Sequence, residues 1–533
     1  MIWLLKDFDL LSVLLRAGTL SLEALTLGGV IFLLFAALPL RSSEDRLRRL
    51  RRITGVAALA LCVTQVASIS TSVAILVGGS GFTFRDILSA DFFFLGVLLS
   101  LSALTIFLLM QTSSRRISAS LLLCSLLILG ASVGMSHAAA RLDHRILLLI
   151  LTALHHVGTA AWIGAMPFLL IALRGEGDDR TALHYARRFS TMAIVSVLLL
   201  LLGGIGMSLF YIGSWQGLYG TTYGVMVLAK AYLLLLILAM GAGNFFLVRQ
   251  LKRAPAPLLV RLRRFSEAEI GLGFTAILAA ASLTSQPPAV DLVHDRLTSH
   301  EIIERMRWEA PRLTSPPFKA LTPTTSIQVG VRESLYNGGA ENDANDRAWS
   351  EYNHHWAGII VLFAGLFALL ARSRRLSWAR HWPLLFIGLA VFIILRADPE
   401  NWPLGPRPFW ASFSAPDVLQ HRLYALLITG FAIFEWAVET GRLASRGASY
   451  VFPLMCAAGG ALLLTHSHAL GNVKDEMLAE MSHTPIALLG ATAGWSRWLE
   501  LRLQSKRNAK IASYIWPVCL ILVGIVLLDY RES

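Results

Sequence analysis

The chain alternates between long apolar runs and short polar segments. Runs such as Ile117–Met135 and Met192–Ile212 continue for about twenty residues with no charged side chain. A helix needs a run of this length to cross the hydrocarbon core of a bilayer, and soluble core helices rarely carry one. The ten-residue alternating segments of a membrane barrel do not occur, so the spans are expected to be helices that satisfy their own backbone polar groups. The pattern predicts an all-α, polytopic integral membrane protein.

About fourteen spans can be placed, and one long polar stretch divides them into two bundles. The spans lie near 10–40, 53–78, 91–110, 117–137, 146–172, 190–213, 222–248, 267–284, 355–371, 382–396, 417–438, 449–467, 482–498 and 511–529. The polar stretch is rich in Pro, Ser, Asn and charge, so it is expected to have little core of its own. We therefore predict an N-terminal domain of eight helices at 1–284, an extracytoplasmic Pro-rich loop at 285–354 and a C-terminal domain of six helices at 355–533.

Basic residues are concentrated in every second loop. The odd-numbered loops, counted from the first, carry 29 Lys and Arg residues, whereas the opposite side carries nine outside the long loop. Because Lys and Arg favour the cytoplasmic side, the odd loops are predicted to be cytoplasmic and both termini periplasmic. The chain is thus expected to be a multi-pass protein of the bacterial inner (cytoplasmic) membrane.

The composition agrees with a membrane protein and excludes several other classes. Hydrophobic residues make up 55% of the 533 residues and charged residues 15%. The net charge of +13 would suit a nucleic-acid binder, but the basic residues lie in short loops, where they orient helices. No GxxxxGK[ST] motif is present, so no nucleotide is expected as a partner. The four cysteines lie within apolar runs without CxxC spacing, which argues against a disulfide scaffold and a thiolate zinc site.

Histidines gather at the predicted outer side. Of the fourteen, only His184 and His381 belong to the predicted cytoplasmic side. In the first half, His137 ends the fourth span, and His155 and His156 lie inside the fifth, with His155 about 13–15 Å along its helix. His155 and His156 diverge by about 100° around that helix, so at most one of them faces His137.

The second half places six histidines at a similar depth near the outer surface. They come from four helices and are His354, His355, His421, His466, His468 and His483. Imidazole suits copper, zinc and heme iron, and the thioethers of Met477 and Met481 favour Cu(I). For any single one of these histidines, the alternative is an interfacial side chain with one wet face. Their shared depth favours one metal site built by His421, His466, His468 and His483, with His355 and the first-half histidines as further candidates.

Three charged side chains fall inside predicted spans. Arg16 and Glu23 lie seven residues apart on one face of the first span, and Lys230 lies inside the seventh. A charge there costs about 2.5–3.5 kcal/mol on insertion scales, so such residues normally face the bundle interior and pair. Two interpretations are open: a structural charge network that joins the first span to the seventh, and an ion path.

Several motifs between the fourth and eighth spans occur together in one order. They are Ser136-His137, His155-His156 followed by AAWIGAMP, Arg188-Phe189-Ser190, TTYGVMVLAK with Lys230, Asn244 and Pro287-Pro288. In this order they resemble the CopD family of bacterial inner-membrane copper proteins, over roughly a quarter to a third of the chain. The resemblance implies a protein of copper uptake or copper tolerance that acts beside periplasmic copper carriers. The last six spans look like the extension carried by longer CopD-like proteins, and no role transfers to them.

The leading hypothesis is a copper-handling inner-membrane protein that takes up or transfers copper from the periplasmic side through the histidine-rich site. The alternative is a membrane oxidoreductase or electron carrier that holds heme b near the outer face, because CopD-like folds also resemble di-heme cytochrome b bundles. A further alternative is an assembly factor that delivers copper to a partner. We recognise no catalytic constellation, and the sequence leaves open whether the chain is an enzyme. The expected partners are the lipid bilayer and a periplasmic copper carrier protein.

Reporter fusions test the predicted topology. Fusions after Arg264 and Lys510 are expected to behave as cytoplasmic, because both residues belong to strongly basic loops. A fusion within 320–345 is expected to behave as exported. A cytoplasmic signal from that loop would contradict the predicted placement of the histidines.

Overall fold

The computed structural model is helical throughout the residues that it describes. These are residues 8–40, 42–79, 81–112, 117–174, 179–250, 255–316, 344–373, 376–398, 401–412, 416–465 and 473–531. No β-strand forms among them; the β pairing there is an isolated bridge between Asn401 and Arg407. The predicted all-α class is therefore confirmed.

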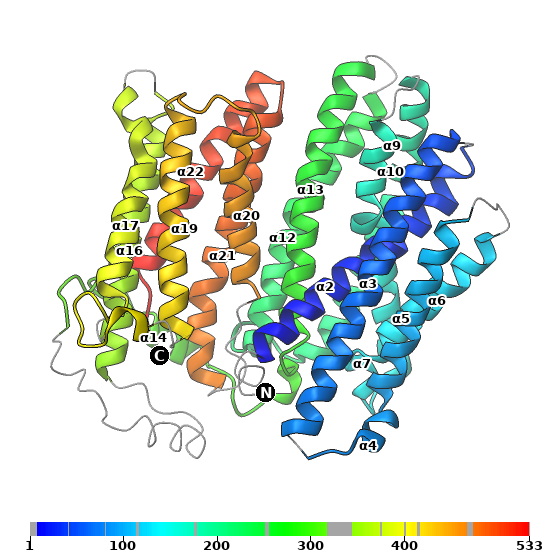
Figure 1. The fold of residues 1–533 in the computed structure, drawn as a ribbon, viewed down its shortest axis with the longest axis horizontal. Coiled ribbons are helices and arrows are strands. Elements are labelled where there is room, and N and C mark those ends of the chain that lie inside the picture. The colour runs from blue at the N-terminus through cyan, green and yellow to red at the C-terminus, as the bar shows by residue number, and fades with distance from the viewer. Residues whose placement is uncertain are drawn as a thin grey trace. The chain divides into compact units, whose positions relative to one another are not determined.

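Residues 8–291 form a series of long helices joined by short ones (Figure 1). In chain order these are α2 (Phe8–Phe32) with the π-helical turn η1 (Leu33–Ala37), α3 (Glu44–Gly79), α4 (Phe84–Leu88), α5 (Asp91–Met110), α6 (Ser118–Gly134), α7 (His137–Ala140), α8 (Arg145–Thr159) with the π-helical turn η3 (Ala160–Gly164), α9 (Met166–Leu173), α10 (Asp179–Ile212), α11 (Trp215–Tyr219), α12 (Thr222–Gln250), α13 (Pro255–Leu283) and the 3-10 turn η4 (Ala289–Asp291).

The remainder of the chain continues in the same way. Its helices are α14 (Ser299–Arg305), α16 (Ala344–Leu370), the 3-10 segment η6 (Ser377–Leu384), α17 (Leu385–Arg396), α18 (Phe409–Ser412), α19 (Pro416–Glu439), the 3-10 turn η7 (Ala448–Tyr450), α20 (Val451–Leu463), α21 (Val473–Arg502) and α22 (Lys506–Leu528).

Ten helices within the described part of the chain are long and apolar enough to cross a bilayer. This confirms a polytopic membrane protein. The other four predicted spans coincide with α6, α19, α20 and α21, which are also helices but are not among the ten. For those four segments the crossing stays a prediction, as does the total of fourteen.

The chain forms two compact units. The first consists chiefly of residues 1–215 and 226–291, and the second chiefly of 216–225, 292–464 and 468–533. The predicted division at 1–284, 285–354 and 355–533 rests on membrane topology rather than on compactness. It stays a prediction.

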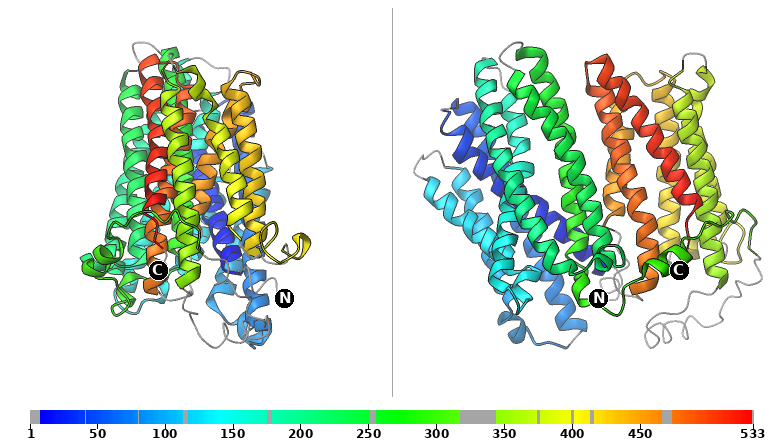
Figure 2. Two further views of the ribbon diagram at one scale, coloured as in Figure 1. Left: turned by 90° about the vertical axis from the view of Figure 1, so that its left-hand side faces the viewer. Right: turned by 180° about the vertical axis from the view of Figure 1, so that it is seen from behind.

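Within the first unit, helix α2 runs obliquely past its neighbours (Figures 1 and 2). It contacts the next helix, α3, and also η3 and α13, which come from distant parts of the sequence. The helix ends alternate as the loop count predicts: α4 and α7 lie at one end of the unit, and the C-terminal ends of α2, α9 and α12 lie at the other (Figures 1 and 2). The side of the membrane that each end faces stays a prediction.

Two glycines allow α2 to approach η3 closely. A Cβ atom on Gly164 would lie 1.9 Å from the carbonyl oxygen of Ala24, and one on Gly28 would lie 2.2 Å from the carbonyl carbon of Gly164. Backbone therefore packs on backbone here, which small residues permit between membrane helices. This contact fixes the level of α2 against the helical segment that carries His155 and His156.

The second unit packs around aromatic side chains. The rings of Trp382, Phe452 and Trp516 are all buried, with centroids 5.2–5.5 Å apart. Beside them, Arg497 bonds Glu439 and Glu500 at 2.7 Å each, and the indole of Trp516 donates to Glu500. These bonds join α19, α21 and α22, so a hydrogen-bonded ion cluster closes one side of the aromatic core.

The close contact at Gly164 predicts a specific loss of stability. Gly164→Ala should destabilise the protein by about 1–3 kcal/mol, because the added methyl group meets backbone that cannot rotate away. Gly130→Ala is the matched control, since nothing lies within 4 Å of the added Cβ atom. Thermal unfolding in detergent checks both variants. Equal melting temperatures for the two would contradict the proposed backbone contact.

Candidate functional site

Glu23 lies buried in the middle of α2. It is 2% exposed, and its carboxylate has two partners from other helices. Ser132 on α6 donates its hydroxyl to Oε2 at 2.7 Å, and Nδ1 of His156 on α8 lies 3.0 Å from Oε1. Arg16, two turns earlier on α2, is close enough to Glu23 to interact with it electrostatically. Three helices therefore converge on one carboxylate.

The Glu23 contact orients the imidazole of His156. Because Nδ1 faces the carboxylate, the ring rotation is fixed and Nε2 points away from Glu23. A carboxylate on the far nitrogen is the usual arrangement behind a metal-ligating histidine, where it sets the tautomer and raises the basicity of the ligating nitrogen. The imidazole of His156 is thus oriented by a carboxylate from another helix.

His155 faces α10 rather than Glu23. Its Nδ1 lies 3.3 Å from the carbonyl oxygen of Leu200, and Gly203 and Gly204 leave room for its backbone and ring. Lys230 of α12 is close enough to His155 for an electrostatic interaction. The two neighbouring histidines therefore face different surroundings, as their helical positions predict.

His137 lies in α7, at the end of the first unit. Its Nε2 is buried and has no hydrogen-bond partner, its ring meets Tyr211 edge-on, and its other side bonds the backbone of Thr284. Burial lowers the pKa of His137 and so favours the neutral imidazole, which is the form that binds metal.

These residues form a series of neighbours inside the first unit. We call this series the polar track; it comprises His137, Arg16, Glu23, His156, His155 and Lys230. The hydrogen-bonded partner of Glu23 is His156, and Lys230 is close enough to His155 for an electrostatic interaction. The predicted network of Arg16, Glu23 and Lys230 stays a prediction.

In the second unit, His355 is held entirely by backbone groups. Its Nδ1 accepts a hydrogen bond from the amide of Arg312 at 2.7 Å, so its Nε2 donates to the carbonyl oxygen of Tyr530, 3.0 Å away. Both ring nitrogens are thus engaged, and His355 has none to offer a metal ion in this arrangement. It instead joins α16 to the segment after α22.

His421 and His483 have separate surroundings in the second unit. Nδ1 of His421 lies 2.9 Å from Oδ1 of Asp398, which repeats the carboxylate–imidazole arrangement of the first unit. The ring of His483 packs against those of His354 and Tyr530. His466 and His468 lie outside the described residues. The predicted four-histidine site therefore stays a prediction.

No group of three or more His, Cys, Asp or Glu side chains forms a metal cluster within the part of the chain that the structure describes. His156 and His421 each face a single carboxylate there, whereas His155 and His355 contact backbone groups. Such pairs present one ligand at a time rather than a closed coordination sphere.

The sequence did not identify two acidic residues as partners of other side chains. Asp398 follows α17 and lay in a predicted loop, so nothing marked it as a partner of His421. Glu269 lay near the start of a predicted span, but α13 begins earlier, at Pro255. Glu269 is therefore in the middle of the helix, where it is buried and accepts a hydrogen bond from Asn244 at 2.5 Å. The signal was present: an acid within an apolar helix normally marks a functional or paired position.

The buried pair predicts the behaviour of Glu23→Gln. The amide removes the negative charge beside Arg16 and His156, leaving a buried cation without compensation, so the variant should lose about 3 kcal/mol of stability. Glu304→Gln, at a side chain 72% exposed, is the control and should change stability by less than about 0.5 kcal/mol. Thermal melting of both purified variants checks this. An unchanged melting temperature for Glu23→Gln would mean that the carboxylate does not hold the three helices together.

Comparison with known proteins agrees with the resemblance found in the sequence. Residues 183–283, which cover most of α10 together with α12 and α13, match the family model for copper resistance protein D (CopD). The chain is 30% identical over 152 residues to the copper transport protein CutJ of Bacillus subtilis (strain 168), a match that covers 28% of this chain and 27% of that protein's length. No solved structure matches the chain. The protein is thus a polytopic helical membrane protein whose segment 183–283 matches the family model for copper resistance protein D.

Proposed function

We propose that this protein transports copper across the inner membrane, taking it up at the periplasmic face and passing it along the polar track of the first unit. The observation that carries the proposal is the buried His156–Glu23 pair, which orients an imidazole ligand in the interior of a helical bundle. Copper is the proposed metal because both the matched family model and the similar protein are named for copper.

The ligand chemistry suits copper. Neutral imidazole is a good ligand for copper, and burial favours the neutral form of histidine. His137 stands at the end of the polar track with a buried nitrogen that lacks a partner, so it is suited to receive an incoming ion. His156 then offers the next oriented imidazole, held by Glu23, which lies two turns along α2 from Arg16.

Paired ligands also suit passage better than storage. An ion moves through a protein only if each site binds it well enough for entry and weakly enough for release. A closed four-ligand cage would hold copper firmly, whereas one imidazole backed by a carboxylate gives intermediate affinity. The His421–Asp398 pair offers a similar ligand in the second unit, where it could take copper from a periplasmic carrier protein.

Copper uptake into proteoliposomes tests the proposal. His156→Ala should reduce the initial rate at least tenfold, because an oriented ligand is lost, and Glu23→Gln should lower copper affinity by about 10–100-fold. His300→Ala is the matched control, because that side chain is 87% exposed and belongs to no pair in the bundle. The double variant His421→Ala/His483→Ala reports separately on the second unit.

Three outcomes would contradict the proposal. If His156→Ala transports copper like wild type at equal folded yield while the His421/His483 double variant does not, the route runs through the second unit. If the purified protein shows a Soret band and no copper transport, the heme b hypothesis replaces it. A stable complex with a copper-receiving enzyme, without transport, would instead identify an assembly factor.

A further inference from the structure

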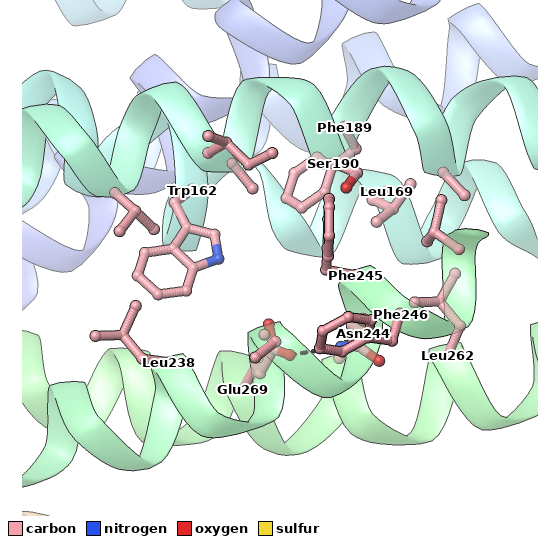
Figure 3. Close-up of a pocket in the computed structure, with 18 of the residues that line it drawn as sticks. Trp162, Leu169, Phe189, Ser190, Leu238, Asn244, Phe245, Phe246, Leu262 and Glu269 are labelled. Carbon is pink, nitrogen blue, oxygen red and sulfur yellow. Dashed lines mark hydrogen bonds between the residues drawn. The ribbon is translucent and has the colours of Figure 1, made fainter. Parts of the chain in front are cut away.

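A cavity of about 380 Å³ lies inside the first unit, away from the polar track. Its walls come from η3, α9, α10, α12 and α13 (Figure 3). All of its lining residues except Trp162 and Leu169 lie within the segment that matches the CopD family. Its size falls in the range of small-molecule sites, which is about 300–1,000 Å³.

The rim of the cavity is apolar and exposed. Ile194 and Leu198 of α10 and Phe246 of α12 line it, and all three side chains lie on the outer surface of the first unit. The helices that carry them are candidate membrane spans. A molecule that enters here therefore comes from the hydrocarbon phase and must be lipophilic.

One wall is polar and its hydrogen bonding is incomplete. The amide nitrogen of Asn244 donates to Glu269 at 2.5 Å and approaches the hydroxyl of Ser266 at 3.5 Å. Asn244 is only 8% exposed, and its Oδ1 atom is buried without a hydrogen-bond partner. A buried acceptor without a donor is costly, so this atom requires an explanation.

The polar wall faces an aromatic one. Figure 3 shows the second carboxyl oxygen of Glu269 pointing into the cavity and the indole nitrogen of Trp162 turned toward the same space, with Phe245 across from them. Aromatic side chains favour a flat ring between them. The polar groups favour a ligand whose ring carries hydrogen-bond donors.

We propose that this cavity binds a membrane-soluble hydroxylated ring, a quinol-type molecule, whose hydroxyl group donates to Oδ1 of Asn244 or to the carboxyl group of Glu269. A plain acyl chain fits the apolar walls but leaves Oδ1 of Asn244 without a donor. A phospholipid head group is too polar for the apolar rim. The site goes beyond the proposed copper transport, which uses different residues.

Equilibrium binding of decylubiquinol to the purified full-length protein in phosphatidylcholine nanodiscs tests the proposal. The quinol is kept reduced under argon, and bound ligand is quantified by chromatography. Wild type should bind it saturably, and the dimethyl ether of the same quinol should bind at least tenfold more weakly, because it has no hydroxyl donor.

Three variants locate the site. Asn244→Leu removes the unsatisfied acceptor and should weaken quinol binding at least tenfold, and Ala193→Trp fills the cavity from α10 and should abolish it. Thr275→Val is the control: Thr275 is buried on α13 but bonds its own helix at the carbonyl of Gly271 and does not line the cavity. It should bind like wild type.

The comparison of quinol with ether uses wild-type protein, so it tests whether binding needs a hydroxyl donor even if a variant fails to fold. Equal affinity for quinol and ether would overturn the proposal, because the cavity would then accept any apolar molecule. Absence of saturable binding, or unchanged binding in folded Asn244→Leu and Ala193→Trp, would overturn it as well.

Discussion

A carboxylate buried among apolar helices is the constraint on which the first unit depends. Glu23 sits where a lone charge would be expensive, so it needs donors and a compensating cation. Ser132 and His156 supply the donors from two other helices, and Arg16 supplies positive charge from α2 itself. Hydrogen bonds and charge, as well as packing, therefore fix the position of α2 along its axis relative to α6 and α8. The same contacts that stabilise the bundle aim an imidazole into it.

Among the candidate histidines that the structure describes, one in each unit faces a carboxylate. His156 faces Glu23 in the first unit, and His421 faces Asp398 in the second. In neither pair does the carboxylate lie on the helix of its histidine, so each pair joins two parts of the chain and fixes a ring orientation at once. The pairs differ in burial: Glu23 is almost wholly covered, whereas the side chain of His421 is 43% exposed. A buried pair suits passage through a bundle, and an exposed pair suits exchange with a carrier.

The fold class and the family resemblance could be predicted from the sequence because each depends on local pattern. Apolar runs of span length identify helices without knowledge of their neighbours. Partners could not be predicted in the same way. The sequence grouped Arg16, Glu23 and Lys230 as charges inside spans, but it could not show that the packing of α2 on η3 brings Glu23 to His156. For His355, the sequence could not reveal that the amide of Arg312, 43 residues earlier, would occupy one ring nitrogen. Glu269 was missed because its helix begins a dozen residues before the predicted span.

The central claim is that copper meets His156, held by Glu23, inside the first unit. Copper K-edge X-ray absorption of purified protein at saturating Cu(I) tests it most directly, because imidazole ligands give a distinctive multiple-scattering pattern. Wild type and His156→Gln are compared at equal folded yield, with bound copper measured on the same samples. The account predicts that both bound copper and the imidazole signal per molecule fall in His156→Gln. An unchanged copper content with an unchanged imidazole signal would contradict it.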